Sequence, residues 1–212
     1  MATKPPNIDD LIAGFDRSLR TLTGNMPTNR PRPGTESPES ALSEDDREHA
    51  AGLMRVNHCG EICAQALYEG QAFTARSNEA RQTLLNAAQE ETDHLNWCRE
   101  RLDELDAKPS VLDPLFYAAS WTMGALTGLA GDRVSLGFVE ATEDRVVKHL
   151  DEHLAQLPED DRRSRAILDQ MREDEAHHAE EAVAQGGTVF PEPIKNVMAV
   201  VSQVMTKTTY KL

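Results

Sequence analysis

The feature that most constrains this chain is a Glu-x-x-His motif that occurs twice, each time within a segment of helical periodicity. Glu91 and His94 form the first pair, and Glu175 and His178 form the second. Residues three apart on a helix lie on one face, about 60° apart around its axis. Any fold of this chain must therefore place two such pairs on two helix faces.

Both pairs interrupt stripes of apolar or small side chains. At helical spacing around the first pair lie Leu84, Ala87, Ala88, Leu95, Cys98 and Leu102, and around the second lie Ile167, Leu168, Met171, Ala179, Ala182 and Val183. Such stripes face the core of a protein. Because an unpaired buried carboxylate is costly, the two pairs predict a shared partner in the interior.

Two further glutamates are predicted to point inward, one on each of two other helical segments. Glu143 has apolar neighbours at its stripe offsets, whereas Glu140 has Arg133 and Asp144 and is predicted to point away. Glu61 lies on a less regular stripe. The residues that share its face are Leu53, Met54, Ala64, Tyr68 and Ala72.

The spacing of these residues suggests an internal repeat. Glu61 precedes Glu91 by 30 residues, and Glu143 precedes Glu175 by 32. Each half of the chain thus supplies one Glu and then one Glu-x-x-His pair, which is the ligand set of di-iron and di-manganese carboxylate bundles. Carboxylate oxygens and imidazole nitrogens suit these metals. The predicted ligands are Glu61, Glu91, His94, Glu143, Glu175 and His178.

The alternative is an acidic bundle whose Glu and His residues face solvent in salt-bridged rows. That arrangement would leave the same helices without a continuous apolar face. The metal-binding hypothesis is therefore the stronger one.

The rest of the chain is also read as helical, because no segment alternates with period 2. The prediction is an all-α protein with a four-helix bundle. Its four site-bearing helices are expected at about 44–76, 78–106, 132–157 and 160–185. Residues 1–43 form a separate N-terminal region, and residues 44–212 form the bundle domain.

The N-terminal region divides into a helix and a linker. Residues 7–24 carry Ile8, Leu11, Ile12, Phe15, Leu19 and Leu22 along one face, and we expect this amphipathic helix to dock on the core, with membrane contact as the alternative. Residues 25–43 are rich in Pro, Ser and Thr and predict an extended linker. Ser43, followed by Glu44 and Asp45, predicts the cap of the next helix.

Two apolar segments lie outside the four site-bearing helices. Residues 114–131 carry no charge and just reach the length needed to span a bilayer. Their three glycines and the flanking Asp113 and Asp132 favour a crossover helix or a segment in a membrane interface instead. Residues 193–212 carry valines and lysines without any acidic residue, and predict a C-terminal helix.

Charge and cysteine content narrow the classes of partner. The formal net charge of −14 argues against nucleic acid and against a purely electrostatic attachment to membranes. The three cysteines, Cys59, Cys63 and Cys98, form no CxxC pair, which disfavours a disulfide framework and a thiolate zinc site. We expect a reduced, intracellular protein without a secretion signal.

Four polar residues near the predicted ligands receive weaker assignments. His58 and His149 are expected to support the site or to lie on the surface rather than to bind metal. Asp93 is expected either to orient an imidazole or to be exposed. Cys98 is expected to be a core thiol.

Several segments resemble the demethoxyubiquinone hydroxylase family of ubiquinone biosynthesis. They are RVNHCGEICAQALYEGQ, EETDHL, KPSVLDPLFYAASWTMGALTGLAGD, VEATEDRVVKHL and EDEAHHAEEAVAQGG. The resemblance covers about residues 45–212. It implies a ferritin-like bundle that holds two iron ions per chain on the same six ligands, with Glu91 and Glu175 bridging the irons and Glu61 as a terminal ligand.

The resemblance also implies an activity and a location. The activity is an O2-dependent hydroxylation of the ring of a demethoxyubiquinol (2-polyprenyl-3-methyl-6-methoxy-1,4-benzoquinol), with no catalytic residue beyond the metal ligands. The location is the cytoplasmic side of a bacterial cell membrane, where the chain is a peripheral protein held by residues 114–131 and the C-terminal helix. The implied partners are the quinol, O2 and the membrane surface. The resemblance is also compatible with a homo-oligomer or with binding to other proteins of ubiquinone biosynthesis.

Three alternatives stay open from the sequence. An iron-storage or peroxide-scavenging ferritin-like protein would share the six ligands, but would not need the two apolar segments. A helical membrane adaptor would lack metal. A related hydroxylase could act on another aromatic compound or on a modified nucleoside, although the acidic surface disfavours a nucleic-acid substrate.

Overall fold

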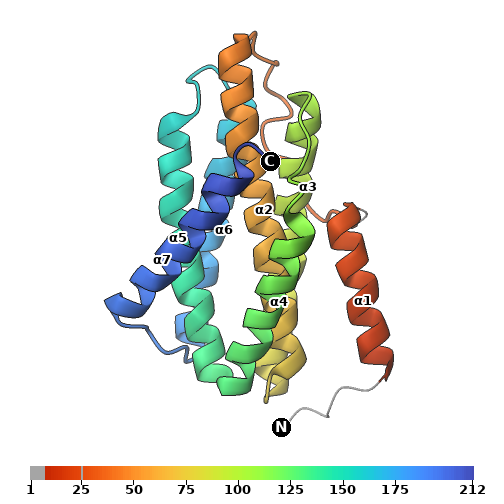
Figure 1. Ribbon diagram of the computed structural model, residues 1–212, viewed down its shortest axis with the longest axis vertical. Helices are drawn as coiled ribbons and strands as arrows, with labels where there is room; N and C mark the ends of the chain where they lie inside the picture. The colour runs from red at the N-terminus through yellow and green to blue at the C-terminus, as the bar shows by residue number, and fades with distance from the viewer. Residues whose placement is uncertain (1–7, 25) are drawn as a thin grey trace.

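The computed structural model describes residues 8–24 and 26–212 (Figure 1). Within these residues the chain forms seven helices and no strand. The helices are α1 (Ile8–Thr23), α2 (Glu44–Thr74), α3 (Asn78–Glu104), α4 (Asp113–Ala130), α5 (Asp132–Gln156), α6 (Arg162–Ala184) and α7 (Glu192–Thr209). The predicted all-α class is confirmed, and the predicted helices lie within a few residues of the observed ones.

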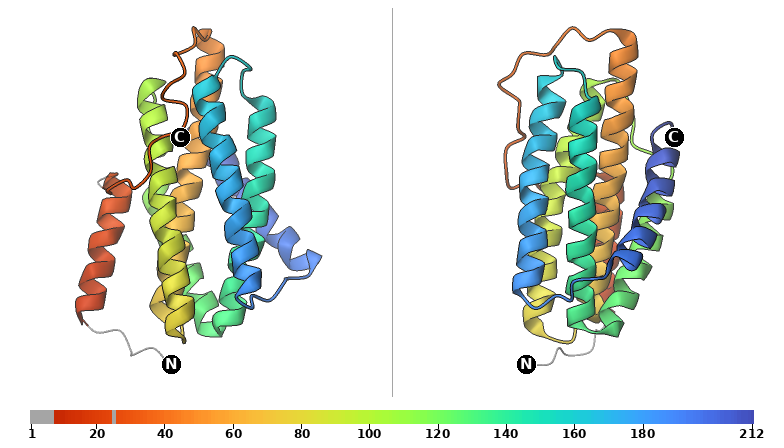
Figure 2. Two further views of the ribbon diagram at one scale, coloured as in Figure 1. Left: turned by 180° about the vertical axis from the view of Figure 1, so that it is seen from behind. Right: turned by 90° about the vertical axis from the view of Figure 1, so that its left-hand side faces the viewer.

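Four long helices, α2, α3, α5 and α6, lie side by side and form the bundle (Figures 1 and 2). The chain runs down α2 and up α3, after which α4 returns it to the lower end so that α5 runs parallel to α3 (Figure 1). This is the predicted long crossover of a ferritin-like four-helix bundle. Helix α6 then runs down beside α5, and α7 crosses the outer face near α4.

Local sequence explains where the bundle helices begin. The Ser43 hydroxyl oxygen accepts a hydrogen bond from the Asp46 backbone N–H at 3.1 Å, and Ser77 caps α3 in the same way through the Ala80 N–H. Such caps satisfy backbone donors that have no partner within the helix. The predicted cap at Ser43 is confirmed.

The crossover helix α4 packs unusually close to α2 because glycines line their contact. A Cβ atom on Gly70 would clash with the carbonyl oxygen of Trp121, and one on Gly124 would clash with that of Leu67. The glycines of α4 were part of the argument against a membrane span. In the structure, Gly124 allows the backbone of α4 to contact that of α2. The other side of α4 leaves Leu115, Met123, Leu126 and Leu129 exposed.

Helix α7 has a similar exposed apolar face. Its exposed members are Ile194, Val197, Val200, Val201 and Val204. Helices α4 and α7 lie on the same side of the bundle (Figures 1 and 2). Among the described residues, no helix combines the length and the apolar character needed to cross a bilayer.

The expectation that α1 docks through its apolar face is wrong for the side chains that the structure describes there. Ile8, Ile12, Phe15 and Leu19 are exposed, and only Leu22 packs against a core cluster. Helix α1 instead meets the bundle through polar groups. The Tyr117 hydroxyl on α4 lies 2.8 Å from the Ser18 hydroxyl and also contacts Glu69 on α2. Buried polar groups such as these need hydrogen-bond partners, which an apolar face of α1 could not offer. The side chain of Leu11 lies outside the described part.

The linker after α1 is bound to the bundle along α3 and α6. Arg32 pairs with Glu100 at 3.3 Å, and the Ser37 carbonyl accepts a hydrogen bond from Arg163 at 3.0 Å. Further along, Glu39 pairs with the buried Arg101 at 2.9 Å. Residues 26–43 form no helix and include a turn at residues 33–36, and they are held against two of the four bundle helices.

One apolar core cluster lies where α2, α3 and α4 meet. Two others lie within the bundle and leave a polar layer between them. One of these two includes Met54, Cys98 and Met171, so the predicted core role of Cys98 is confirmed. The other includes Tyr68 and Leu84. On each helix the predicted ligands fall between residues of these two clusters, so the site is enclosed by the core.

Candidate metal centre

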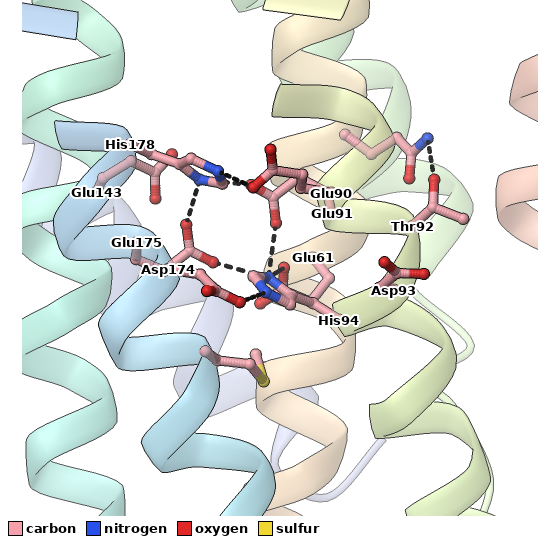
Figure 3. Close-up of polar contacts among 12 residues, drawn as sticks. Glu61, Glu90, Glu91, Thr92, Asp93, His94, Glu143, Asp174, Glu175 and His178 are labelled. Atoms are coloured by element: carbon pink, nitrogen blue, oxygen red, sulfur yellow. Dashed lines mark hydrogen bonds and ion pairs between the residues drawn. The ribbon is translucent and has the colours of Figure 1, made fainter. Parts of the chain in front are cut away.

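The structure brings all six predicted ligands into this polar layer (Figure 3). Helix α2 supplies Glu61, α3 supplies Glu91 and His94, α5 supplies Glu143, and α6 supplies Glu175 and His178. Every one of these side chains is buried. A solvent-facing arrangement of these Glu and His residues is therefore wrong, because the apolar stripes that flank them turn inward. Val183, near the end of α6, is the exception and is exposed.

The first half of the centre gathers around His94. Its Nδ1 atom lies 3.0 Å from Glu175 Oε1, 3.1 Å from Glu91 Oε2 and 3.6 Å from Glu61 Oε2. One ligand atom from each of these four residues lies within 4.8 Å of the others. This group can hold a metal ion.

The second half gathers around His178 and uses the remaining oxygens of the same two glutamates. His178 Nδ1 lies 2.9 Å from Glu175 Oε2 and 3.3 Å from Glu91 Oε1. Each of these glutamates therefore turns one oxygen toward each histidine (Figure 3). A carboxylate in this position can bridge two cations.

Glu143 completes the second half in the way that Glu61 completes the first. Its Oε1 atom accepts a hydrogen bond from the buried Tyr68 hydroxyl. Its Oε2 atom is buried and accepts no hydrogen bond from the described residues, and the same holds for Glu61 Oε2. These free oxygens are available to a cation.

The electrostatics of the layer also favour a cation. Burial, together with the neighbouring carboxylates, raises the pKa of Glu61 and of Glu143 well above the usual range. Four carboxylates cannot all remain charged in an apolar interior without positive partners. Two divalent cations would supply the missing charge, and the oxygen and imidazole donors suit iron or manganese. The residues present thus fit a dinuclear metal site.

Each histidine also contacts a carboxylate through its outward nitrogen. His94 Nε2 lies 2.9 Å from Asp174 Oδ2, and His178 Nε2 lies 3.0 Å from Glu90 Oε2. Such contacts fix the tautomer of a metal-binding imidazole and leave the other nitrogen free for the metal. Asp174 is on α6 and Glu90 is on α3, so each supports the histidine of the opposite helix.

Sequence reasoning missed Asp174, Glu90 and Tyr68. A signal was present for the first two, since an acidic residue directly precedes the glutamate of each Glu-x-x-His pair. That these residues cross to the opposite helix could not be read from the sequence. Tyr68 was seen only as a member of the stripe around Glu61.

The weaker assignments at His58 and His149 have different outcomes. His58 is fully buried, and its Nδ1 atom lies 3.2 Å from Asp113 at the start of α4. His149 lies against His153, with 3.8 Å between ring centroids. The contacts recorded for both histidines are thus with residues other than the six predicted ligands.

Asp93 has neither of its expected roles. It is buried, and it accepts hydrogen bonds from the backbone of Asn29 at 2.7 Å and from Arg30 Nε at 3.2 Å. It therefore anchors the linker rather than an imidazole. Glu140, which was predicted to point away from the site, pairs with Lys195 at 2.7 Å. His177, next to the predicted ligand His178, is exposed.

Comparison with known proteins agrees with this architecture. Residues 48–209 match the model of a family described as ubiquinone biosynthesis protein COQ7. The chain is 55% identical to the 3-demethoxyubiquinol 3-hydroxylase of Pseudomonas paraeruginosa, over 97% of this chain and 96% of the relative. It is 54% identical to the protein of that name from Chromohalobacter salexigens, over the full length of both. The chain therefore belongs to the COQ7 family of ubiquinone biosynthesis proteins.

Proposed function

We propose that this protein is an O2-dependent di-iron monooxygenase that hydroxylates the ring of a 3-demethoxyubiquinol in ubiquinone biosynthesis. The observation that carries the proposal is the position of Glu91 and Glu175, each with one oxygen toward His94 and one toward His178. The relatives named for this reaction match nearly the whole chain.

In this proposal Glu61 and His94 would hold one iron, Glu143 and His178 would hold the other, and Glu91 and Glu175 would each contribute to both. When bound, a pair of ferrous ions would supply the two electrons that a monooxygenation with O2 requires. One oxygen atom would be added to the ring carbon and the other would leave as water with two protons, and two electrons from a separate reductant would return the metal pair to the ferrous state.

The chain's own residues prepare the site for this chemistry. The Tyr68 hydroxyl holds Glu143 in one orientation, and Asp174 and Glu90 hold the two imidazoles. The apolar clusters on either side of the polar layer limit the access of water, which suppresses side reactions. Three of the six predicted ligands are thus held by other side chains of the protein.

We also propose that the protein acts at the membrane surface, on the cytoplasmic side of a bacterial cell membrane. A polyprenyl quinol is lipid-soluble. Helices α4 and α7, each of which has exposed apolar side chains, lie on the same side of the bundle (Figures 1 and 2). Lys207 and Lys211 near the C-terminus add positive charge beside this face. Such a surface suits insertion into an interface rather than a span.

The activity is tested by complementation of a bacterial strain that lacks its demethoxyubiquinol hydroxylase, with quinone intermediates measured by mass spectrometry. We expect the wild-type chain to restore ubiquinone and a Glu175→Ala variant to leave the demethoxy precursor in place. Build-up of the precursor with the wild-type chain would refute the proposal. Iron uptake without any hydroxylated product would indicate an iron-storage or peroxide-scavenging protein instead.

Membrane attachment is tested by flotation with vesicles that contain anionic lipid. The variant Val200→Asp/Val204→Asp places charges on the exposed face of α7, and we expect it to remain in the unbound fraction. Val183→Asp is the matched control, because Val183 is an exposed valine on α6, outside α4 and α7. Equal flotation of both variants would contradict the proposed surface.

A further inference from the structure

The linker places one arginine directly against the candidate metal centre. Arg30 Nη1 lies 2.8 Å from Asp174 on α6, and its Nε atom lies 3.2 Å from Asp93 on α3. The guanidinium carbon also lies 4.9 Å from the centre of the Trp97 ring. One side chain from outside the bundle thus joins two of the helices that carry ligands.

Arg30 and His94 share the same oxygen of Asp174. Asp174 Oδ2 is 2.8 Å from Arg30 Nη1 and 2.9 Å from His94 Nε2. Because a guanidinium donates from a fixed planar fork, it holds this carboxylate in place. Arg30 Nη2 also lies 3.2 Å from His94 Nε2, so the guanidinium and Asp174 together hold the outward side of this imidazole. The Nδ1 atom then faces Glu91 and Glu175.

The support of the other histidine is more exposed. The side chain of Glu90, which contacts His178 Nε2, is 50% exposed, whereas that of Asp174 is 15% exposed. A half-exposed glutamate keeps more rotamer freedom and exchanges its contacts with water more readily. The two halves of the centre therefore have the same ligand types but unequal supports.

We infer that Arg30 is a positioning residue for the His94 half of the centre, so that the N-terminal linker makes one metal position release its ion more slowly than the other. This inference rests on the proposed function, because it requires two metal ions. It assigns the N-terminal region, which lies outside residues 48–209 of the family match, a role in the centre itself.

A purely structural role of Arg30 makes a different prediction. If Arg30 only attached the linker to the bundle, substitution of any other linker arginine that binds the bundle should change metal release by the same amount. Arg32 provides that comparison, since it pairs with Glu100 at 3.3 Å and also with Glu104, both on α3 beyond His94. Neither glutamate is a predicted ligand or a support of a histidine.

The experiment measures release of iron from the anaerobically reconstituted holoprotein to a coloured ferrous chelator. For the wild-type chain we expect two phases of equal amplitude, with the slow phase from the His94 half. Arg30→Gln should speed the slow phase by about 10-fold or more, which is the usual scale for losing an outer partner of a metal ligand. Arg32→Gln should leave both phases unchanged, and Arg30→Lys should restore part of the slow phase.

Two further measurements separate positioning from a general loss of structure. The Mössbauer spectrum of the ⁵⁷Fe-loaded Arg30→Gln variant should change in one of two quadrupole doublets and keep the other. The double variant Arg30→Gln/Asp174→Asn should release iron no faster than Asp174→Asn alone, because both substitutions break one connected contact. Thermal unfolding of Arg30→Gln should match that of Arg32→Gln.

Several results would overturn the inference. They are a single release phase in the wild type, equal acceleration by Arg30→Gln and Arg32→Gln, and an unchanged spectrum of Arg30→Gln. Failure of the wild-type chain to take up two irons would instead refute the proposed di-iron function. The two failures are therefore distinguishable.

Discussion

The His94 half and the His178 half of the candidate centre use the same residue types, yet they differ in what surrounds them. Both offer an imidazole Nδ1, one glutamate of their own and one oxygen from each of two shared glutamates. The first half is closed by Asp174 and the linker residue Arg30, whereas the second is supported by the half-exposed Glu90 and by Tyr68 on Glu143. A repeat in sequence thus does not produce two equivalent surroundings for the two histidines.

Substitution of a shared glutamate should impair metal binding in both halves at once. Glu175→Ala removes an oxygen from both histidines, so we expect the loss of both metal ions and of turnover to background. Metal content by mass spectrometry and hydroxylation of a short-chain quinol measure the two effects. Glu173→Ala is the control on the same helix, because Glu173 is exposed. Retention of one full metal equivalent by Glu175→Ala would contradict the bridging geometry.

A histidine substitution should separate the two halves. His178→Ala removes one ligand from the second half alone, so we expect metal content to fall toward one ion per chain while turnover is lost. His177→Ala should keep both ions, since His177 lies about 100° away around the helix axis and is exposed. If the two variants lose metal equally, the inward face of α6 has been misassigned.

The same half can be tested from α5. Glu143→Ala should abolish turnover and lower metal occupancy, with a smaller loss of metal than His178→Ala because the bridging glutamates and His178 remain. Glu140→Ala should do neither, because Glu140 pairs with Lys195 on α7 rather than with a ligand. Comparable effects of both variants on metal content would argue against Glu143 as a ligand.

Removal of the tyrosine hydroxyl should have a moderate effect on one half. Tyr68→Phe frees Glu143 to reorient, and we expect metal affinity of the second half to weaken by about 10- to 100-fold, with the fold retained. Tyr117→Phe is the matched control, because its hydroxyl contacts Glu69 and Ser18 away from the ligands. Competitive titration with a chelator of known affinity measures the difference. An equal change in metal affinity in the two variants would show that Tyr68 does not support the centre.

The smallest effect is expected at the exposed support. Glu90→Gln retains a hydrogen-bond acceptor for His178 and is already half exposed, so we expect iron release from the second half to accelerate only about 2- to 5-fold, below the usual range for an outer partner. Asp174→Asn, at the more buried support of the first half, should have the larger effect on release. The reverse order would show that burial does not decide the strength of these supports.

Much of the fold and of the candidate site was predictable from periodicity. The helix positions and the inward direction of the six ligands follow from apolar stripes, because a helix fixes which residues share a face. The prediction for α1 failed because its amphipathic pattern indicates a helix with an apolar face but does not indicate what covers that face. In the structure, polar contacts of Ser18 hold α1 while Phe15 remains exposed.

The sequence by itself determined the helical class, the repeated Glu and Glu-x-x-His pattern and the six residues that converge in the core. Only the tertiary structure decided which oxygen faces which histidine, that Asp174 and Glu90 support the histidines of opposite helices, and that Arg30 reaches the centre from the linker. The physical reason is that helical periodicity fixes directions around one axis. Contacts between helices depend on their relative rotation and depth, which packing of the whole bundle sets.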